Sequence, residues 1–225
     1  MGVSGGPNAI QDGLVLSLDA SDRNSYVSGS ATWIDLSANT TNGAIQTASF
    51  SNNGGGSLFF NGITCSVSVN STALQDLGGT INTWIYPVAS PTSAGYIFSA
   101  FGTNSNRFYI TQFVNAISAT RGNPTVTVNF INSITYNQWY NLTATWVSSS
   151  LSSSLSTYLN GVFIGSNSYT ASGTTSTFAI GGFINSGGSQ AFSGSIAITQ
   201  VYNRPLSAVE VQQNYNALKT RFGLT

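Results

Sequence analysis

Residues 139–165 constrain the fold of this chain more than any other stretch. Apolar and polar side chains alternate over residues 139–146, which predicts a strand with one buried face. The apolar face would hold Tyr140, Leu142, Ala144 and Trp146, and the polar face Asn141, Thr143 and Thr145. Asn160-Gly161 then separates two β-rich runs and favours a hairpin, because a type I′ turn needs positive φ at both central residues. The stretch therefore predicts the middle of an antiparallel sheet.

Shorter pieces of the same pattern occur along the whole chain. We expect further strands at residues 13–19, 57–60, 64–69, 80–86, 95–101, 107–113, 125–131, 176–180 and 193–202. Asn61-Gly62 predicts a second hairpin, Asn42-Gly43 a turn toward Ala44-Ile45, and residues 71–77 a helical turn or a loop. Turn signals spaced by about a dozen residues are typical of an all-β sandwich of two antiparallel sheets.

Near the C-terminus, over residues 207–221, the spacing of the apolar residues changes from that of a strand to that of a helix. Ser207 and Glu210 form the Ser-x-x-Glu pattern of a capping box, and Leu206 and Val211 are placed for a hydrophobic staple. Apolar side chains at helical spacing predict one face that packs on the sandwich, and basic residues near the end suit the helix dipole. The apolar residues are Val211, Tyr215, Leu218 and Phe222, and the basic ones are Lys219 and Arg221.

Length and composition fit one large domain. Of 225 residues, 41% are hydrophobic, enough for a core, and no apolar run is long enough to cross a bilayer. We expect an extended N-terminal arm at residues 1–12 and a single domain over residues 13–225. The lone Cys65 rules out an intrachain disulfide and is expected to be a small buried apolar residue.

Charge is scarce. Only 5% of the residues are charged, against roughly 25% in ordinary soluble domains, and the formal net charge is zero. No basic patch is present to neutralise phosphates, so we expect no nucleic-acid partner. The start of the chain lacks the basic and apolar regions of a signal peptide, so we expect synthesis in a cytoplasm and no ordinary secretion. The sequons at Asn39, Asn70 and Asn141 then have no role.

The sequence argues against catalysis. Glycoside hydrolysis needs two carboxyl groups about 5–9.5 Å apart, yet no acidic residue occurs between Asp76 and Glu210. Glu210, the one glutamate, is better explained as a helix cap. The chain has no histidine and therefore no Ser-His-Asp or Cys-His pair. We expect no catalytic residues, no cofactor-binding residues and no required cofactor.

Calcium is the one metal to consider. Asp19, Asp22 and Asp35 form the only acidic cluster, with Asn24 and Asn39 nearby, and calcium prefers such oxygen ligands. Their spacing fits no defined calcium loop, and Asp after a strand commonly forms Asx turns. We favour these turns and assign no metal ligand, with calcium as the alternative.

Aromatic residues could stack on sugar rings. The four tryptophans are Trp33, Trp84, Trp139 and Trp146. The last three are better interpreted as core, because they lie in or beside strands that alternate with buried residues. Loop tyrosines are freer candidates for a glycan site: Tyr26, Tyr96, Tyr136 and Tyr169.

Several segments, in the right order over nearly the whole chain, resemble the laminin-G-like and concanavalin A-like jelly-roll domains. Residues 13–20, 33–37 and 42–43 resemble the opening of such domains, residues 83–87, 139–146 and 159–161 their middle strands, and residues 192–196 and 201–215 their ending. The resemblance implies a curved two-sheet sandwich that binds glycans or proteins, often with calcium. Residues 6–8 and 211–223 are similar to such domains in structural proteins of bacteriophages, among them marine phages of cyanobacteria.

These observations predict an all-β, two-sheet antiparallel jelly-roll sandwich with one C-terminal α-helix. The expected function is that of a non-enzymatic virion structural protein, a capsid decoration or appendage displayed on the virion surface and made in the host cytoplasm. Its partners would be other virion proteins, copies of itself and host-surface glycans, without membrane insertion, and residues 2–12 could dock it to the particle or to a neighbouring copy. The alternative is a free carbohydrate-binding lectin or adhesion module of a cell, located outside it.

Overall fold

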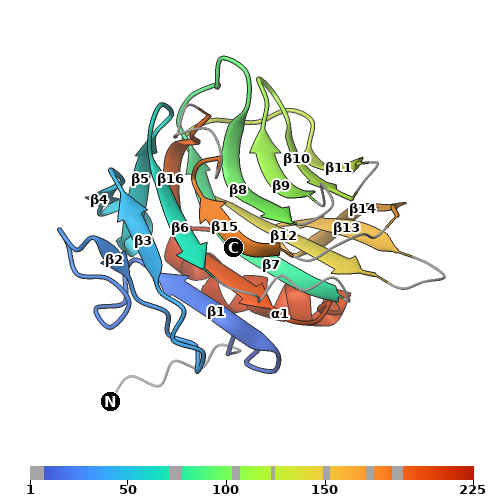
Figure 1. Cartoon of the computed structure of the whole chain (residues 1–225), viewed down its shortest axis with the longest axis horizontal. Helices are drawn as coiled ribbons and strands as arrows, with labels where there is room; N and C mark the ends of the chain where they lie inside the picture. The colour runs from blue at the N-terminus through green and yellow to red at the C-terminus, as the bar shows by residue number, and fades with distance from the viewer. Residues whose placement is uncertain are drawn as a thin grey trace.

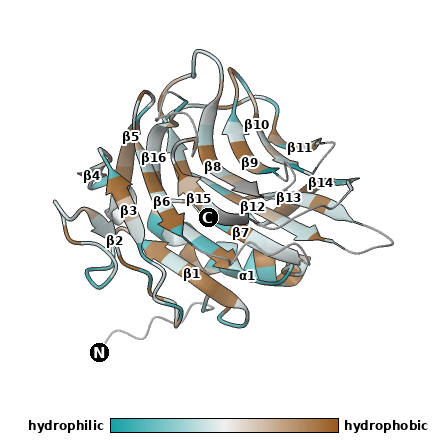
Figure 2. Ribbon diagram, in the orientation of Figure 1, coloured by the Kyte–Doolittle hydropathy of each residue, from teal (hydrophilic) through white to brown (hydrophobic). Residues whose placement is uncertain are grey.

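Two antiparallel sheets form a sandwich in the computed structural model (Figure 1). The structure describes residues 8–70, 78–102, 107–122, 125–148, 153–170, 175–183 and 190–225. Residues 1–7 of the expected arm and the expected turn or loop at residues 71–77 lie outside these ranges. Figure 2 shows hydrophobic stretches on strands such as β1 (Leu14–Asp19) and β8 (Gly95–Gly102).

The first sheet, sheet A, has the strand order β14-β13-β12-β7-β16-β5-β4, with β1 also paired to β16. Besides β1, its strands are β4 (Ser49–Ser51), β5 (Ser57–Asn61), β7 (Gly78–Pro87), β12 (Tyr140–Val147), β13 (Ser154–Leu159), β14 (Val162–Ser168) and β16 (Ser193–Tyr202). The predicted central hairpin is confirmed: β13 and β14 pair, and Asn160 and Gly161 have φ of 50° and 77°.

The second sheet, sheet B, has the order β11-β10-β9-β8-β15-β6-β3-β2. Besides β8, its strands are β2 (Thr32–Trp33), β3 (Gly43–Gln46), β6 (Ser66–Asn70), β9 (Arg107–Gln112), β10 (Ile117–Arg121), β11 (Val126–Ile131) and β15 (Thr175–Ile180). Strand β10 is not among the predicted strands, because its small side chains and the buried Arg121 hide the alternation of apolar and polar residues.

The predicted hairpin at Asn61-Gly62 is wrong. The turn exists, because the Asn61 side chain accepts bonds from the backbone of Ile63 and Thr64, and Gly62 has φ of 76°. However, β5 belongs to sheet A and β6 to sheet B, so the turn carries the chain from one sheet to the other. Local turn chemistry fixes the reversal but not the sheet that the next strand joins.

The main core fills the space between the two sheets. It includes Trp33, Trp146 and the alternating residues of β12, and Cys65 is buried in it as expected. Arg121 is also buried there, with its guanidinium 4.7 Å from the Trp146 ring centroid and its Nε donating to the Tyr169 hydroxyl at 2.9 Å. Aromatic rings thus surround this cation.

The helical end begins as predicted and ends differently. Helix α1 (Ala208–Leu218) starts with the Ser207–Glu210 capping box, and a 3-10 turn, η3 (Lys219–Phe222), follows. Leu206 and Val211 lie in one buried cluster, as the staple requires. Arg221 does not serve its own helix dipole: it pairs with Asp19 at 2.8 Å and donates to the carbonyls of Gly54 and Gly56. Its long side chain reaches the β1 end instead.

Helix α1 and η3 cover the outer face of sheet A, the face turned away from the main core. Trp84 of β7 and Trp139 contact Phe222 there, with ring centroids 4.1 and 4.6 Å apart, and Tyr202 and Tyr158 lie in the cluster near the helix start. The prediction that β12 has only one buried face is therefore wrong: Asn141 and Thr143 on its polar side are 0% and 1% exposed.

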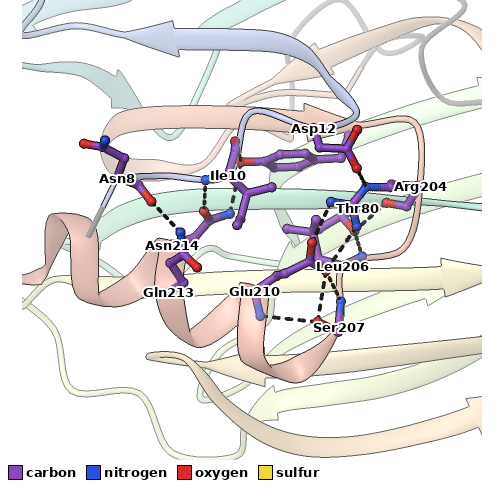
Figure 3. A network of polar contacts seen from close by, with 11 residues as sticks. Asn8, Ile10, Asp12, Thr80, Arg204, Leu206, Ser207, Glu210, Gln213 and Asn214 are labelled. Carbon is purple, nitrogen blue, oxygen red and sulfur yellow. Dashed lines mark hydrogen bonds and ion pairs between the residues drawn. The ribbon is translucent and has the colours of Figure 1, made fainter.

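The described N-terminal residues are attached to this same layer (Figure 3). Asn214 of α1 accepts a bond from the Ile10 backbone at 2.8 Å, and Gln213 donates to the Asn8 carbonyl at 2.8 Å. Arg204 pairs with Asp12 and with Glu210, at 2.8 and 2.6 Å. Residues 8–12 thus contact the chain's own helix, while a separate arm over residues 1–12 stays a prediction.

Candidate functional site

The two sheets differ in what covers their outer faces. Sheet A carries α1, η3 and residues 8–12 on its outer face. Within the described part of the chain, no helix packs on sheet B. The outer face of sheet B is therefore the candidate ligand surface.

Strand register determines which side chains share this face. Tyr96 lies opposite Thr111, Thr111 opposite Ser118, and Ser118 opposite Asn129. Because directly paired residues of antiparallel strands point to the same side, these four form one row across β8, β9, β10 and β11. A second row runs through Ala179, Ser99, Tyr109, Thr120 and Thr127. Hydroxyl-bearing side chains therefore dominate the face.

Three aromatic rings cluster here: Tyr96 and Tyr109 from the two rows, and Phe183 from the segment after β15. The Tyr96 ring lies 5.3 Å from Tyr109, edge to face, and 4.6 Å from Phe183, centroid to centroid. Tyr96 and Phe183 are partly exposed, whereas Tyr109 is 8% exposed. Burial raises the pKa of both tyrosines, and the nearby positive charge of Arg107 partly offsets this. Both phenols therefore stay neutral at physiological pH and can donate or accept hydrogen bonds.

The hydroxyls of the face differ in their partners. Thr120 and Thr127 bond each other at 3.0 Å, and Ser99 donates to the Gly182 carbonyl at 2.8 Å. Ser118 is 2% exposed and its Oγ has no partner. Thr127 and Asn129 are exposed on the outermost strand. The exposed polar groups are thus on β11 at the sheet edge, whereas the aromatic cluster lies on β8, on β9 and just after β15.

The three aspartates considered for calcium are each engaged by groups of the chain. Asp19 pairs with Arg221 and accepts from the Ser21 backbone, and the Asp22 side chain accepts from the Asn24 backbone in an Asx turn. Asp35 is buried and accepts from the backbone of Ser17, Ser37 and Thr41. The Asn39 side chain donates to the Val15 carbonyl. Among the residues that the structure describes, no three His, Cys, Asp or Glu side chains form a possible metal group.

The other described carboxylates lie at the helix start. Glu210 bonds Arg204 and Ser207, and the Arg204 guanidinium lowers its pKa to about 2. Asp12 pairs with the same arginine. Both lie at Arg204 beside the start of α1, and Glu210 is explained by its helix cap, as the sequence indicated.

The aromatic candidates from the sequence separate into two groups. All four tryptophans are buried, as expected for Trp84, Trp139 and Trp146, and Trp33 joins them. Tyr26 and Tyr169 were wrong as loop candidates, because each is buried: Tyr26 stacks on Phe50 and Tyr169 bonds Arg121. Tyr96 and Tyr136 are partly exposed, and only Tyr96 belongs to the sheet B face.

Sequence reasoning missed Tyr109 and Phe183. The signal for Tyr109 was present, because Phe108 and Ile110 are inward-facing neighbours in a predicted strand and place Tyr109 on the opposite side. Phe183 follows the end of β15, and no periodic signal marks its position. In the described residues no helix is long and apolar enough to span a bilayer.

Comparisons with solved structures agree with this architecture. A Trypanosoma rangeli sialidase in complex with sialic acid has a TM-score of 0.72 and 16% identity, over 93% of this chain and 33% of that one. Domain 4 of AbnA, an extracellular arabinanase of Geobacillus stearothermophilus in complex with arabinotriose, has a TM-score of 0.71 and 15% identity. This match covers 92% of this chain and 100% of that one. The binding domain of botulinum neurotoxin DC in complex with rat synaptotagmin II has a TM-score of 0.69 and 17% identity. This match covers 93% of this chain and 52% of that one.

The chain thus spans about a third of the sialidase and half of the neurotoxin domain, and these low identities concern the fold alone. The comparison with curated proteins found no match. The model of the Laminin_G_3 family matches residues 60–212, from the end of β5 into α1. As this match covers more than half of its residues, the chain belongs to that family, within the concanavalin A-like lectin/glucanases superfamily.

Proposed function

We propose that this chain is a non-enzymatic binding domain that holds a glycan on the outer face of sheet B and is displayed on the surface of a virion. The observation that carries the glycan part is Tyr96, whose partly exposed ring lies against Tyr109 and Phe183 on a face of hydroxyls. A ring face packs on the apolar side of a pyranose, while nearby polar groups bond its hydroxyls. Thr127 and Asn129 supply exposed polar groups.

The absence of acids from the central sequence supports a binding role. No acidic residue lies between Asp76 and Glu210, so β8 to β15 contain no carboxylate side chain. A glycosidase needs an acid and a second carboxylate on either side of its substrate. We expect no release of reducing sugar from any polysaccharide, measured over days at high protein concentration. Sustained turnover that purifies with the protein would refute the non-enzymatic proposal.

Binding should not require calcium. Asp19 and Asp35 already accept bonds from a guanidinium and from backbone N–H groups, so calcium would have to displace these partners. We expect equal glycan affinity in excess chelator and in calcium, measured by calorimetry. A loss of affinity or of thermal stability in chelator would establish a metal role.

The test of the glycan site begins with an array and continues with the sugar that gives the strongest signal. We expect Tyr96→Ala to weaken its binding about tenfold, equal to about 1.4 kcal/mol, by loss of the stacking ring. Tyr136→Ala is the matched control, because Tyr136 is also partly exposed but lies between β11 and β12, where its hydroxyl donates to Val114. Full affinity in Tyr96→Ala, or no glycan bound at all, would contradict the assignment.

The virion part rests on the chain ends. Residues 6–8 and 211–223 are similar to domains in phage structural proteins, and the charge-poor composition suits a surface with little dependence on salt. Its partners there would be other virion proteins or copies of the chain, and its site of synthesis the host cytoplasm. Mass spectrometry of purified particles is expected to detect the chain in stoichiometric amounts. Its absence would end this part and leave the glycan site in place.

The second candidate is a free carbohydrate-binding lectin of a cell, acting outside it. The family, described as lectins and glucanases, favours this candidate. Saturable binding to one sugar without particle association would support the lectin. Particle association without any sugar binding would support a purely structural decoration.

A further inference from the structure

Five strands pair with a single neighbour: β1, β2, β4, β11 and β14. The free side of β1 bonds the chain itself, because Leu36 N–H donates to the Ser17 carbonyl and Ser17 N–H donates to Asp35 Oδ1. Strands β2 and β4 have two and three residues, too short to pair with much of another chain. Strand β11 packs beside β13 and β14: Thr157 donates to the Asn129 carbonyl at 2.9 Å, and a Cβ on Gly165 would lie 3.6 Å from Val128. Strand β14 has seven residues, all of them exposed except the half-buried Gly165. It lies at the end of sheet A, next to β13 (Figure 1).

Strand β14 carries an unusual surface for an outermost strand. Val162, Phe163 and Ile164 are 61%, 52% and 45% exposed in succession. A bulge between Thr157 and Tyr158 makes Ile164 the extra residue, so all three side chains reach solvent. Proteins usually protect such edges with charges or proline, and residues 162–168 contain neither.

The backbone of β14 also has unused bonding groups. Its ladder runs to β13 alone, and within the described residues its one further backbone bond is from Ser168 N–H to Asn167 Oδ1. The N–H and C=O groups that point away from β13 can therefore bond an added strand. This edge offers both backbone bonds and apolar side chains to a partner.

We propose that β14 pairs with β14 of a second copy of this chain, antiparallel about a twofold axis. With Phe163 opposite its copy, Val162 of one chain lies opposite Ile164 of the other, so apolar side chains meet apolar side chains. An uncharged strand gives no ion pair to a charged partner and does not repel its own copy, and the chain's net charge is zero. The apolar and uncharged side chains of the two β14 strands therefore favour pairing between copies. This proposal does not depend on the glycan proposal.

The contact is small, since the bulge limits the ladder to a few residues. Interfaces at the low end of the size range are weak and reversible. A twofold contact also closes on itself, because each chain has one β14 edge, so dimers form and nothing larger.

Sedimentation velocity from about 1 µM to about 1 mM tests the contact over the range where a small interface dissociates. We expect the wild type to shift from monomer to dimer, and Val162→Lys and Ile164→Lys to weaken the dimer at least tenfold. Val27→Lys is the matched control, since Val27 lies in the loop after β1 and is 63% exposed against 61% for Val162. It should dimerise like the wild type, and all variants should keep the wild-type melting temperature.

Crosslinking gives a second readout that does not depend on a lysine. Cys65 is 1% exposed, so a new surface thiol reports alone. Mild oxidation should link Phe163→Cys into a disulfide dimer much faster than Val27→Cys. A wild type that stays monomeric over the whole range, assemblies larger than a dimer, or a dimer unaffected by Val162→Lys would each overturn the proposal.

Discussion

The outer faces of the two sheets have similar polar residues but differ in how far these residues are buried. On sheet A, Asn82, Asn141 and Thr143 are fully enclosed, since α1 and η3 lie over them. On sheet B, Thr127 and Asn129 remain exposed, and Ser118 is enclosed without a partner. The C-terminal helix and η3 therefore cover the polar side chains of sheet A, whereas Thr127 and Asn129 of sheet B stay accessible to the ligand that we propose.

Enclosure on sheet A comes with several bonds for the Asn82 side chain, although the buried Trp84 Nε1 on the same face has no partner. The Asn82 side-chain oxygen accepts from Asn141 and Thr143, each at 2.8 Å, and its nitrogen donates to Gln200 at 2.9 Å. Two apolar clusters beneath α1 and η3 keep water away from this network: the aromatic cluster of Trp84 and Phe222, and the cluster of Leu206 and Val211. Substitutions on this face should therefore affect stability, and those on the sheet B face should affect binding.

The largest effect is expected for Trp84→Ala. Trp84 is fully buried and stacks on Phe222 and Tyr215, so its removal leaves a cavity and should lower the free energy of unfolding by about 3–5 kcal/mol. Urea unfolding measures this, with Tyr96→Ala on the other face expected to lose about 1 kcal/mol. Equal losses for the two variants would break the comparison between the faces.

Asn82→Ala should be the next largest. It leaves the side-chain oxygen of Gln200 buried without its partner, and the Asn141 amide keeps only its longer bond to the Thr83 carbonyl, at 3.4 Å. The fold should lose about 2–4 kcal/mol of stability. Thr127→Ala, a hydroxyl lost from the exposed face, is the control and should change stability by less than about 0.5 kcal/mol. A small loss in Asn82→Ala would mean that water enters beneath the helix.

Glu210→Gln tests the attachment of the helix and should lose about 1 kcal/mol. The Arg204 contact lowers the Glu210 pKa from near 4.5 to about 2, so the carboxylate stabilises the fold above its unfolded value and this contribution is lost as pH falls from about 4.5 toward 2. Wild-type stability should decline over that window more steeply than that of Glu210→Gln. Parallel pH curves for the two proteins would argue that the Arg204–Glu210 pair contributes nothing.

Ser118→Ala is expected to have the smallest effect and the opposite sign. It removes a buried hydroxyl that has no partner, so stability should stay level or rise by up to about 1 kcal/mol. Chemical unfolding can resolve a change of this size when wild type and variant are measured together. A clear loss of stability would show that this hydroxyl has a bonding partner in solution.

Much of this architecture follows from alternation and turn chemistry. The period along β12 predicted the strand and its apolar side correctly, and the capping box placed the helix start at Ser207. Alternation gives two faces but not their cover, so the burial of Asn141 could not be predicted without knowing where α1 packs. Similarly, Asn61-Gly62 marked a turn but not the change of sheet.

The candidate site was predicted less completely than the fold. Tyr96 was chosen as a loop residue and lies in β8, where strand pairing brings it to Tyr109, thirteen positions away in the sequence. Tyr26 and Tyr169 looked free because loops are usually exposed, yet both rings fill gaps at the core. Such packing depends on contacts distant in sequence, which a single chain's pattern does not contain.

The most direct test is an NMR titration of the labelled protein with the glycan that binds best on the array. We predict that the shift changes map to Tyr96, Tyr109 and Phe183 and to exposed residues of β11, while the indole signals of Trp84 and Trp139 stay in place. Shift changes centred on α1, with an unperturbed Tyr96, would contradict the assignment of sheet B as the binding face.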